Sequence, residues 1–407
     1  MRLISPAQLP GLLDRLPAEP RVVTQGSFGT PHRLLELIDA QLERYRLFVV
    51  NELPGLPHRD GVRHETIFVG PGLRGHQFDY YPCRLSLMPR LFCGPLAPDL
   101  VAVQVSRPVG GKVSLGIEVQ VLPGALAAAK ARGALIVAQL NHAMPFVHGD
   151  GVLDPDDFDA VLELDQEIPT APRIHVDEAA AEIGARVAAM VPDGAALQAG
   201  IGAVPDAVLS ALVGHRGMRV WTELLSEGFR QLHLAGSLDG SQPVIGSFAF
   251  GPPEFYEWID DNPQVRLLSC EHTNSPAVIA AQPQMTSINT ALQVDLFGAA
   301  NASRINHRIF SGTGGQTDFF VGAMHASGGQ AVMALKSWHP KANVSTIVPK
   351  LGEPTTSLQF SSVVTEHGTA TVWGASQRDQ ALGIIEAADP RARGDLYAAA
   401  EGFGLIG

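Results

Sequence analysis

A glycine-rich segment offers the first candidate chemistry in this sequence. It reads Gly312-Thr313-Gly314-Gly315-Gln316 and lies between apolar stretches. Adjacent glycines leave backbone N–H groups uncovered, so that they can point at a negative charge that develops during a reaction. We therefore consider an oxyanion-stabilising loop, with a plain turn or bulge as the alternative.

Glu223 is the candidate nucleophile. It follows the stretch 219–222, whose composition predicts a strand, and in open α/β sheets ligands bind at the carboxyl ends of strands. A carboxylate at such an edge can attack a carbonyl and form a covalent intermediate. A single strand-end glutamate can also be an ordinary solvated residue, so its significance depends on its neighbours.

A second glycine turn, Gly200-Ile201-Gly202-Ala203, joins a predicted strand at 195–199 to a predicted helix at 206–213. Backbone amides at the start of that helix can approach a ligand closely, whereas a tight turn without a ligand would use the same residues.

Other site types are disfavoured by the sequence. The run 70–75 formally matches GxGxxG, but prolines at positions 71, 82 and 89 oppose the long helix of a nicotinamide-binding fold. None of the histidines that we considered shows the i,i+4 spacing of a helical metal pair with a carboxylate, so we expect no metal site. No GxSxG elbow of a serine hydrolase occurs.

Composition limits the partners. A net charge of -12 argues against a nucleic acid or an anionic membrane, since both need a basic surface, and favours small-molecule substrates. Three cysteines without CxxC spacing fit thiols in a reducing compartment. With no run of about 18 apolar residues, we expect a cytoplasmic protein that does not associate with a membrane.

The order of predicted elements indicates α/β architecture. Short apolar runs, such as 21–24, 100–105 and 134–139, alternate with helical stretches, which is typical of parallel strands joined by helices. The segment 166–172 holds two prolines in a polar setting and reads as a linker. We therefore predict two similar α/β domains, residues 1–172 and 173–407, the second carrying Glu223.

Ordered segments along nearly the whole chain resemble the acetyl-CoA hydrolase/transferase family, the class I CoA transferases. The length is closest to 4-hydroxybutyrate CoA-transferase-like members. The resemblance rests on the runs 103–106, 114–116, 144–145, 148–150, 200–208, 222–223, 226–228, 288–292, 311–319 and 364–368. It implies two open-sheet domains with the active site at their interface, and a homodimer.

The resemblance also implies roles for individual residues. Glu223 matches the nucleophilic glutamate, Asn274 an active-site asparagine, Gly315 the glycine whose amide holds the acyl oxygen, and Glu366 a supporting acid. Residues implied to contact substrate or coenzyme A are Gly200, Ile201, Gly202, Ala203, Gly312, Gly314 and Gln316.

The implied reaction moves coenzyme A from a short-chain acyl-CoA to a carboxylate acceptor through a glutamyl-CoA thioester, by ping-pong kinetics. No cofactor is expected beyond coenzyme A as a substrate. One departure is Gln293, where the family usually has a glutamate. Two alternatives stay open: an acyl-CoA hydrolase that uses the same glutamate, and a catalytically silent CoA-binding protein.

Overall fold

The chain divides into two compact units that do not follow the sequence as two uninterrupted halves. The computed structural model describes residues 2–171 and 175–407. One unit is Met1–Pro172 with Pro243–Thr273, and the other is Arg173–Gln242 with Asn274–Gly407. The predicted boundary between residues 172 and 173 lies outside the described residues.

The predicted second domain, residues 173–407, is wrong in one respect, because 243–273 belongs with the first unit. One strand pairing links this segment to the first unit. Strands β14 (Val244–Gly246) and β16 (Val265–Leu267) pair in parallel, and β16 also pairs in parallel with β8 (His148–Gly149) of the first unit. Pairing between strands so far apart in the sequence cannot be predicted from local composition.

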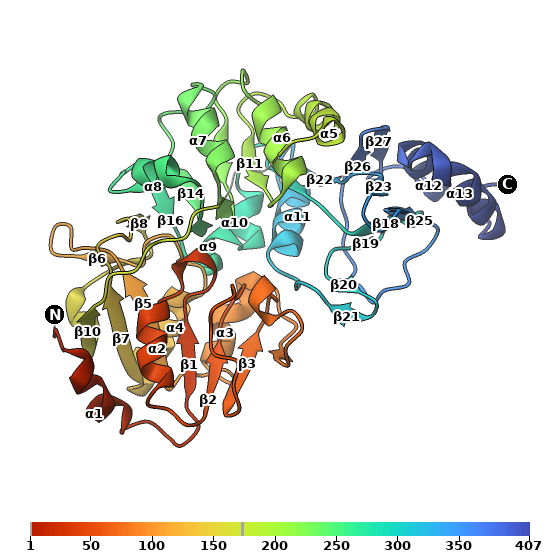
Figure 1. Ribbon diagram of the computed structural model, residues 1–407. Coiled ribbons are helices and arrows are strands. Elements are labelled where there is room, and N and C mark those ends of the chain that lie inside the picture. Colours follow the sequence, from red (N-terminus) through yellow and green to blue (C-terminus); the bar gives the residue numbers. More distant parts are fainter. Residues whose placement is uncertain (1, 172–174) are drawn as a thin grey trace. The chain divides into compact units, whose positions relative to one another are not determined.

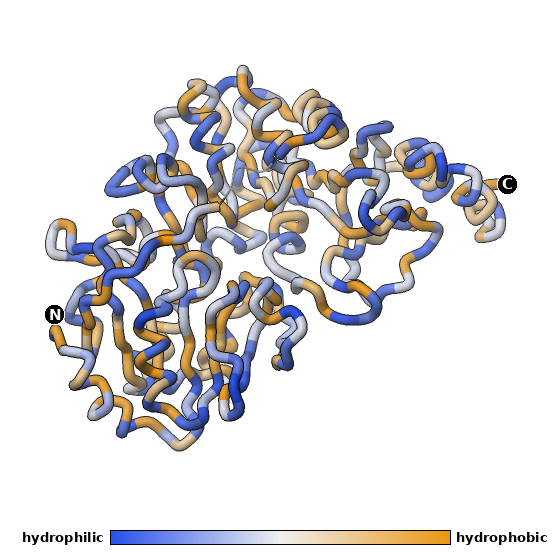
Figure 2. Tube along the Cα trace, in the orientation of Figure 1, coloured by the Kyte–Doolittle hydropathy of each residue, from blue (hydrophilic) through white to orange (hydrophobic). Residues whose placement is uncertain are grey.

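The first unit is built on a parallel sheet of order β10-β7-β5-β1-β2-β3-β4 (Figure 1). Its strands are β1 (Arg21–Thr24), β2 (Tyr45–Phe48), β3 (Val62–Thr66), β4 (Asp79–Tyr80), β5 (Leu100–Val105), β7 (Leu135–Leu140) and β10 (Ala160–Glu163). Every residue of β5 and β7 is buried, as expected for central strands covered on both faces. Strands β5 and β7 consist mainly of apolar residues, and Figure 2 colours the chain by hydropathy.

Short elements complete the first unit. Its helices are α1 (Leu9–Leu13), α2 (His32–Asp39), α3 (Met88–Phe92), α4 (Leu122–Arg132), α8 (Pro253–Ile259) and α9 (Cys270–Thr273). Strands β6 (Val113–Ser114) and β9 (Val152–Leu153) form an antiparallel pair, and β15 spans Phe248–Ala249. Leu34, Leu35 and Ile38 place one side of α2 in the core, which is the i, i+1, i+4 pattern of an amphipathic helix.

The second unit repeats the α/β pattern. Its main strands follow the order β27-β26-β22-β17-β11-β12, and all neighbours are parallel except the hairpin of β26 and β27. The strands are β11 (Ala196–Ala199), β12 (Arg219–Trp221), β17 (Thr286–Asn289), β22 (Gln330–Ala334), β26 (Ser362–Thr365) and β27 (Gly368–Thr371). The α/β prediction is confirmed.

Helices and small sheets surround these strands. The helices are α5 (Glu178–Ala188), α6 (Ala203–Ala211), α7 (Glu227–Leu234), α10 (Pro276–Ala280), α11 (Gln316–His325), α12 (Gln377–Ala387) and α13 (Pro390–Gly402). The minor strands are β13 (Leu224–Leu225), β18 (Gln293–Asp295), β19 (Ala300–Asn301), β20 (Arg304–Ile305), β21 (Arg308–Ile309), β23 (Trp338–His339), β24 (Val344–Ser345) and β25 (Ile347–Val348). Within the described ranges, no helix is long and apolar enough to cross a membrane.

The helix predicted at 206–213 begins earlier, at Ala203, and ends at Ala211. Gly202 is its N-cap and has a φ of 124°, a backbone conformation that glycine adopts without steric cost. The turn therefore passes directly into the helix.

We expect the packing of α5 on α6 to depend on glycine at position 184. A Cβ atom there would lie 2.7 Å from the backbone of Ala207, so Gly184→Ala should lower the free energy of unfolding by about 1–3 kcal/mol. Gly394→Ala, within α13 and with no atom inside 4 Å, should instead raise it by about 0.5–1 kcal/mol. Chemical denaturation measures both variants, and equal changes would contradict the close packing.

Candidate active site

Glu223 lies where the chain leaves β12. The preceding residue, Thr222, is buried, and its Oγ1 donates a hydrogen bond to the carbonyl oxygen of Leu224, 3.0 Å away. This short side-chain contact bends the backbone around Glu223 before α7 begins at Glu227. The carboxylate is therefore carried by a fixed turn at the carboxyl end of a parallel strand, and the residue as a whole is partly buried.

Asn274 holds the carboxylate of Glu223. Its side chain is fully buried, and its Nδ2 donates a hydrogen bond to Oε2 of Glu223 at 2.8 Å. Pro276, two residues later, begins α10, a position where proline is pre-organised for a helix. The amide thus comes from the start of a helix and supplies a neutral donor to the carboxylate.

Gly315 packs directly against this pair. A Cβ atom at residue 315 would lie 1.7 Å from Oε2 of Glu223 and 2.2 Å from Nδ2 of Asn274. Only glycine fits, because a Cβ at those distances would occupy the space of both side chains. Gly315 is also the N-cap of α11, and Gly314 before it has a φ of 55°, which favours glycine in the turn.

The pKa of Glu223 is raised from 4.5 to about 7. Burial is the main cause, because removing a carboxylate from water disfavours its charged form. The hydrogen bond from Asn274 lowers the pKa, and the negative charge of Asp318 raises it further. The carboxyl group therefore changes its charge near neutral pH.

Asp318 is a residue of this site that the sequence analysis did not select. It is fully buried in the first turn of α11, three residues after Gly315. The sequence did contain an indication of its importance, because an acidic residue in an apolar helix directly after a glycine-rich loop is unusual. Its influence on Glu223 could not be read from spacing alone.

The Gly200–Ala203 turn lies at the same edge of the sheet as Glu223. Strands β11 and β12 are parallel neighbours, so the turn after β11 and Glu223 after β12 follow adjacent carboxyl ends. Gly200 N–H donates to the carbonyl of Ile288 at 3.0 Å, and the side chain of Ile201 is 50% exposed. The turn is thus anchored at one end and open at the other.

The remaining residues of the glycine-rich segment have structural contacts. Gln316 Nε2 donates to the carbonyl of Thr290 at 3.1 Å, which ties the start of α11 to the end of β17. Gly312 is buried and Gly314 is partly buried in the loop before α11. Their predicted contact with coenzyme A stays a prediction.

Glu366 is not brought to Glu223. It follows β26, and three strands, β22, β17 and β11, separate β26 from β12 in the sheet order. Its carboxylate accepts hydrogen bonds from Ser337, from the backbone N–H at 2.9 Å and from Oγ at 2.8 Å. Its contacts therefore give it a role in fixing the loop after β22. Gln293 begins β18 in a small sheet with β19 and β25.

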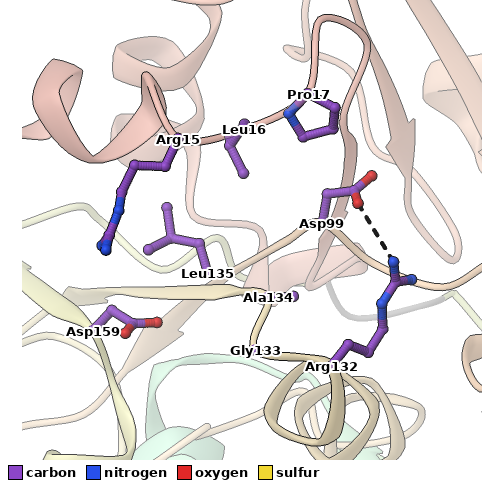
Figure 3. Close-up of a pocket in the computed structure, with 9 residues that line it drawn as sticks. All are labelled: Arg15, Leu16, Pro17, Asp99, Arg132, Gly133, Ala134, Leu135 and Asp159. Carbon is purple, nitrogen blue, oxygen red and sulfur yellow. Dashed lines mark ion pairs between the residues drawn. The ribbon is translucent and has the colours of Figure 1, made fainter.

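A hollow in the first unit lies at the amino ends of strands, the opposite edge from the one where ligands bind (Figure 3). Its residues Asp99, Ala134 and Asp159 lie at the amino ends of β5, β7 and β10. Asp99 and Asp159 accept hydrogen bonds from the backbone N–H groups of Arg21 and Ile136 at 2.9 and 2.8 Å. Because these carboxylates are occupied by the backbone, and ligands bind at carboxyl ends, we assign no function to this hollow.

Comparison with known proteins identifies the family. Residues 251–400 match the model of the acetyl-CoA hydrolase/transferase C-terminal domain. The 4-hydroxybutyrate coenzyme A transferase of Clostridium kluyveri is 33% identical over 350 residues, which cover 82% of this chain and 81% of that protein. The succinyl-CoA:acetate/propanoyl-CoA:succinate CoA transferase of Fasciola hepatica is 33% identical over 93% of this chain and 84% of its own.

A solved structure agrees. The 4-hydroxybutyrate CoA-transferase of Porphyromonas gingivalis superimposes with a TM-score of 0.83 at 28% identity, covering 99% of this chain and 98% of that one. Proteins named acetyl-CoA hydrolase also match, over shorter parts of the chain. This chain belongs to the acetyl-CoA hydrolase/transferase family, which confirms the resemblance, and the family consists of enzymes.

We expect Glu223→Gln to stabilise the protein at alkaline pH. An acid whose pKa is raised on folding contributes stability that is full below the unfolded value, 4.5, and is lost as pH rises through the folded value, about 7. At pH 8 the buried charge is therefore unfavourable, and replacing it with an isosteric amide should raise the free energy of unfolding by on the order of 1–3 kcal/mol.

The gain should be much smaller at pH 5, because the folded Glu223 carboxyl of the wild type is then protonated and as uncharged as the amide that replaces it. Denaturant titrations at the two pH values measure the difference, with Glu254→Gln, on the exposed surface of α8, as a control. An equal gain at both values would show that the charge of Glu223 is not destabilising.

Proposed function

We propose that this protein is a CoA-transferase that moves coenzyme A between a short-chain acyl-CoA and an acceptor carboxylate, such as acetate, butyrate or 4-hydroxybutyrate, with Glu223 as nucleophile. One observation carries the proposal: the Glu223 carboxylate, held at 2.8 Å by a buried amide, lies against a glycine that leaves its oxygen uncovered. The relatives named as CoA transferases support the substrate class.

The first half-reaction begins with attack by a Glu223 oxygen on the thioester carbonyl. The C–S bond breaks, giving a mixed anhydride and coenzyme A thiolate, and the thiolate then attacks the glutamyl carbonyl. The donor acid leaves as a carboxylate, and a glutamyl-CoA thioester remains. An acceptor carboxylate attacks that thioester and runs the same steps in reverse, so the thioester energy is conserved.

Each attack creates a tetrahedral carbon with a negative oxygen, which needs hydrogen-bond donors. The Asn274 Nδ2 and the Gly315 N–H are the donors proposed for this role. Since both come from helix starts, α10 and α11, they are held in place before the charge develops. Such pre-organised donors stabilise the transition state without reorganisation.

Burial of Glu223 serves the same chemistry. A carboxylate with few water contacts is a stronger nucleophile than a hydrated one, because less solvation is lost on attack. The raised pKa means that the fraction in the reactive, charged form grows as the pH increases through about 7.

A hydrolase is the second candidate, because relatives named acetyl-CoA hydrolase share the family. The two functions differ in what attacks the glutamyl-CoA carbonyl, water or an acceptor carboxylate. Turnover of acyl-CoA with and without acetate separates them, and turnover that is independent of the acceptor would identify a hydrolase.

We also propose that the protein is cytoplasmic and forms a homodimer. The three cysteines, Cys83, Cys93 and Cys270, are not joined by disulfides, which fits a reducing compartment. The dimer rests on resemblance to the family.

We expect a covalent coenzyme A adduct on Glu223. The protein is incubated with acetyl-CoA, butyryl-CoA or 4-hydroxybutyryl-CoA without acceptor, quenched in acid and digested. Mass spectrometry should find coenzyme A on the peptide that contains Glu223, and added acetate should remove it. Glu223→Gln should give no adduct, and an adduct of equal yield in that variant would refute the assignment.

The rate of adduct formation should rise with pH to a plateau, with a midpoint near the folded pKa of about 7, since only the charged carboxylate attacks. Asn274→Ala should shift this midpoint upward, because the hydrogen bond that lowers the pKa is lost. A midpoint that does not move would show that Asn274 does not interact with the reacting carboxylate.

Gly315→Ala should lower the transfer rate by about 10²–10³-fold, the range for loss of one oxyanion donor. The added methyl group would overlap Glu223 and Asn274 and so displace both from the position shown here. Gly352→Ala, where a Cβ meets no atom within 4 Å, is the matched control and should keep full activity. Single-turnover rates measure both, and an active Gly315→Ala would contradict the geometry.

A further inference from the structure

Glu52 is a buried carboxylate in the first unit, remote in sequence from every residue of the candidate active site. Its exposed fraction is 0%, and it follows β2 by four residues. Gly72 N–H donates to its carbonyl oxygen at 2.9 Å, and a Cβ atom at Gly70 would lie 2.1 Å from the same oxygen. The glycines of the run 70–75 thus allow a close approach to the Glu52 backbone.

Two imidazole rings share this carboxylate. His58 Nε2 lies 2.9 Å from Oε1 and His64 Nδ1 lies 2.7 Å from Oε2 of Glu52. In the part of the chain that the structure describes, these histidines are its ion-pair partners. The ligand-capable atoms of the three residues all lie within 4.8 Å of one another.

His64 faces an acceptor on each side of its ring. Its Nε2 is 3.0 Å from the carbonyl oxygen of Pro57, and its Nδ1 faces Glu52. A neutral imidazole carries only one N–H, so one of these contacts needs an additional cation, either a second proton or a metal ion. If Nε2 donates to the carbonyl, Nδ1 has the lone pair that a metal requires, and the Pro57 contact orients the ring as outer partners of metal-bound histidines do.

One of the three residues, His64, lines a cavity. A cavity of about 600 Å³ is lined by Val62, Arg63, His64, His76, Gln77, Phe78 and Asp79. The ring of His58 is stacked between those of His64 and His76, with centroids 4.1 and 3.9 Å apart. The His58 side chain is 19% exposed, against 2% for His64, so it is the ring with more freedom to move.

We propose that Glu52, His58 and His64 bind a divalent transition-metal ion, with Zn²⁺ as the best fit. Two imidazoles and one carboxylate form a donor set typical of zinc, whereas Mg²⁺ and Ca²⁺ prefer oxygen ligands alone. The His58 and His64 rings are nearly parallel, at 7°, and their nitrogens contact different oxygens of Glu52. Metal binding therefore requires the more exposed His58 ring to tilt.

The test uses the full-length protein, stripped with a chelator and desalted. Zn²⁺ affinity is measured by competition with a chromophoric chelator, and Co²⁺ is added separately to record its visible absorption. We expect one tight equivalent of Zn²⁺ per chain and the intense Co²⁺ bands of a low-coordinate nitrogen and oxygen site. Because loss of an outer-shell partner alone costs 10–100-fold, His58→Gln should weaken Zn²⁺ binding by at least about 100-fold.

His142→Gln is the matched control. His142 is an exposed histidine of the same unit, with Asp165 and Glu163 beside it at 3.1 and 3.6 Å, so it represents an ordinary surface cluster. Its loss should leave the tight equivalent unchanged. Glu52→Gln should also abolish the tight site, and His58→Gln, at a partly exposed position, keeps the test valid if Glu52→Gln does not fold.

Two results would overturn the proposal: a stripped protein that takes up no tight Zn²⁺, or equal affinity in the wild type and His58→Gln. In either case the second cation at His64 is a proton and the cluster is an ion-paired part of the core.

Discussion

The site depends on a carboxylate that is taken out of water and met by a neutral amide in place of a cation. A positive partner would pair with Glu223 and lower its reactivity, whereas Asn274 orients one oxygen and leaves the charge uncompensated. Asp318 adds a second negative charge nearby. The fold therefore maintains an unfavourable arrangement, and the rigid helix starts around it are what make that arrangement possible.

Parallel topology explains how four distant segments meet. More than a hundred residues of sequence separate the Gly200 turn from Gly315, with Glu223 and Asn274 between them, yet all four belong to one unit. The Gly200 turn and Glu223 follow neighbouring strands of its sheet, and Asn274 and Gly315 lie at the starts of helices. In a parallel sheet every carboxyl end lies on the same side, so connections can converge there while the strands stay buried. The absence of a Cβ at Gly315 then sets the final distance.

Local patterns in the sequence predicted elements such as strand β5, from its continuous apolar run, and helix α6, from the glycine turn before it. The grouping of Glu223, Asn274 and Gly315 came from resemblance to a family, because nothing local connects them. Glu366 shows the limit: its motif was recognisable, but three strands lie between β26, which precedes Glu366, and β12, which precedes Glu223. Likewise Glu52, His58 and His64 have no helical metal spacing, because a loop and a strand bring them together.

The interleaving of the two units has a consequence for synthesis on the ribosome. Residues 243–273 complete the first unit, and the chain must pass through 173–242 of the second unit before they exist. A growing chain of 240 residues therefore holds one unit that lacks β14 and β16 and another that lacks β17, β22 and β26. The seven-stranded sheet of the first unit is complete by Glu163, so during translation it precedes the segment 243–273 that joins it later.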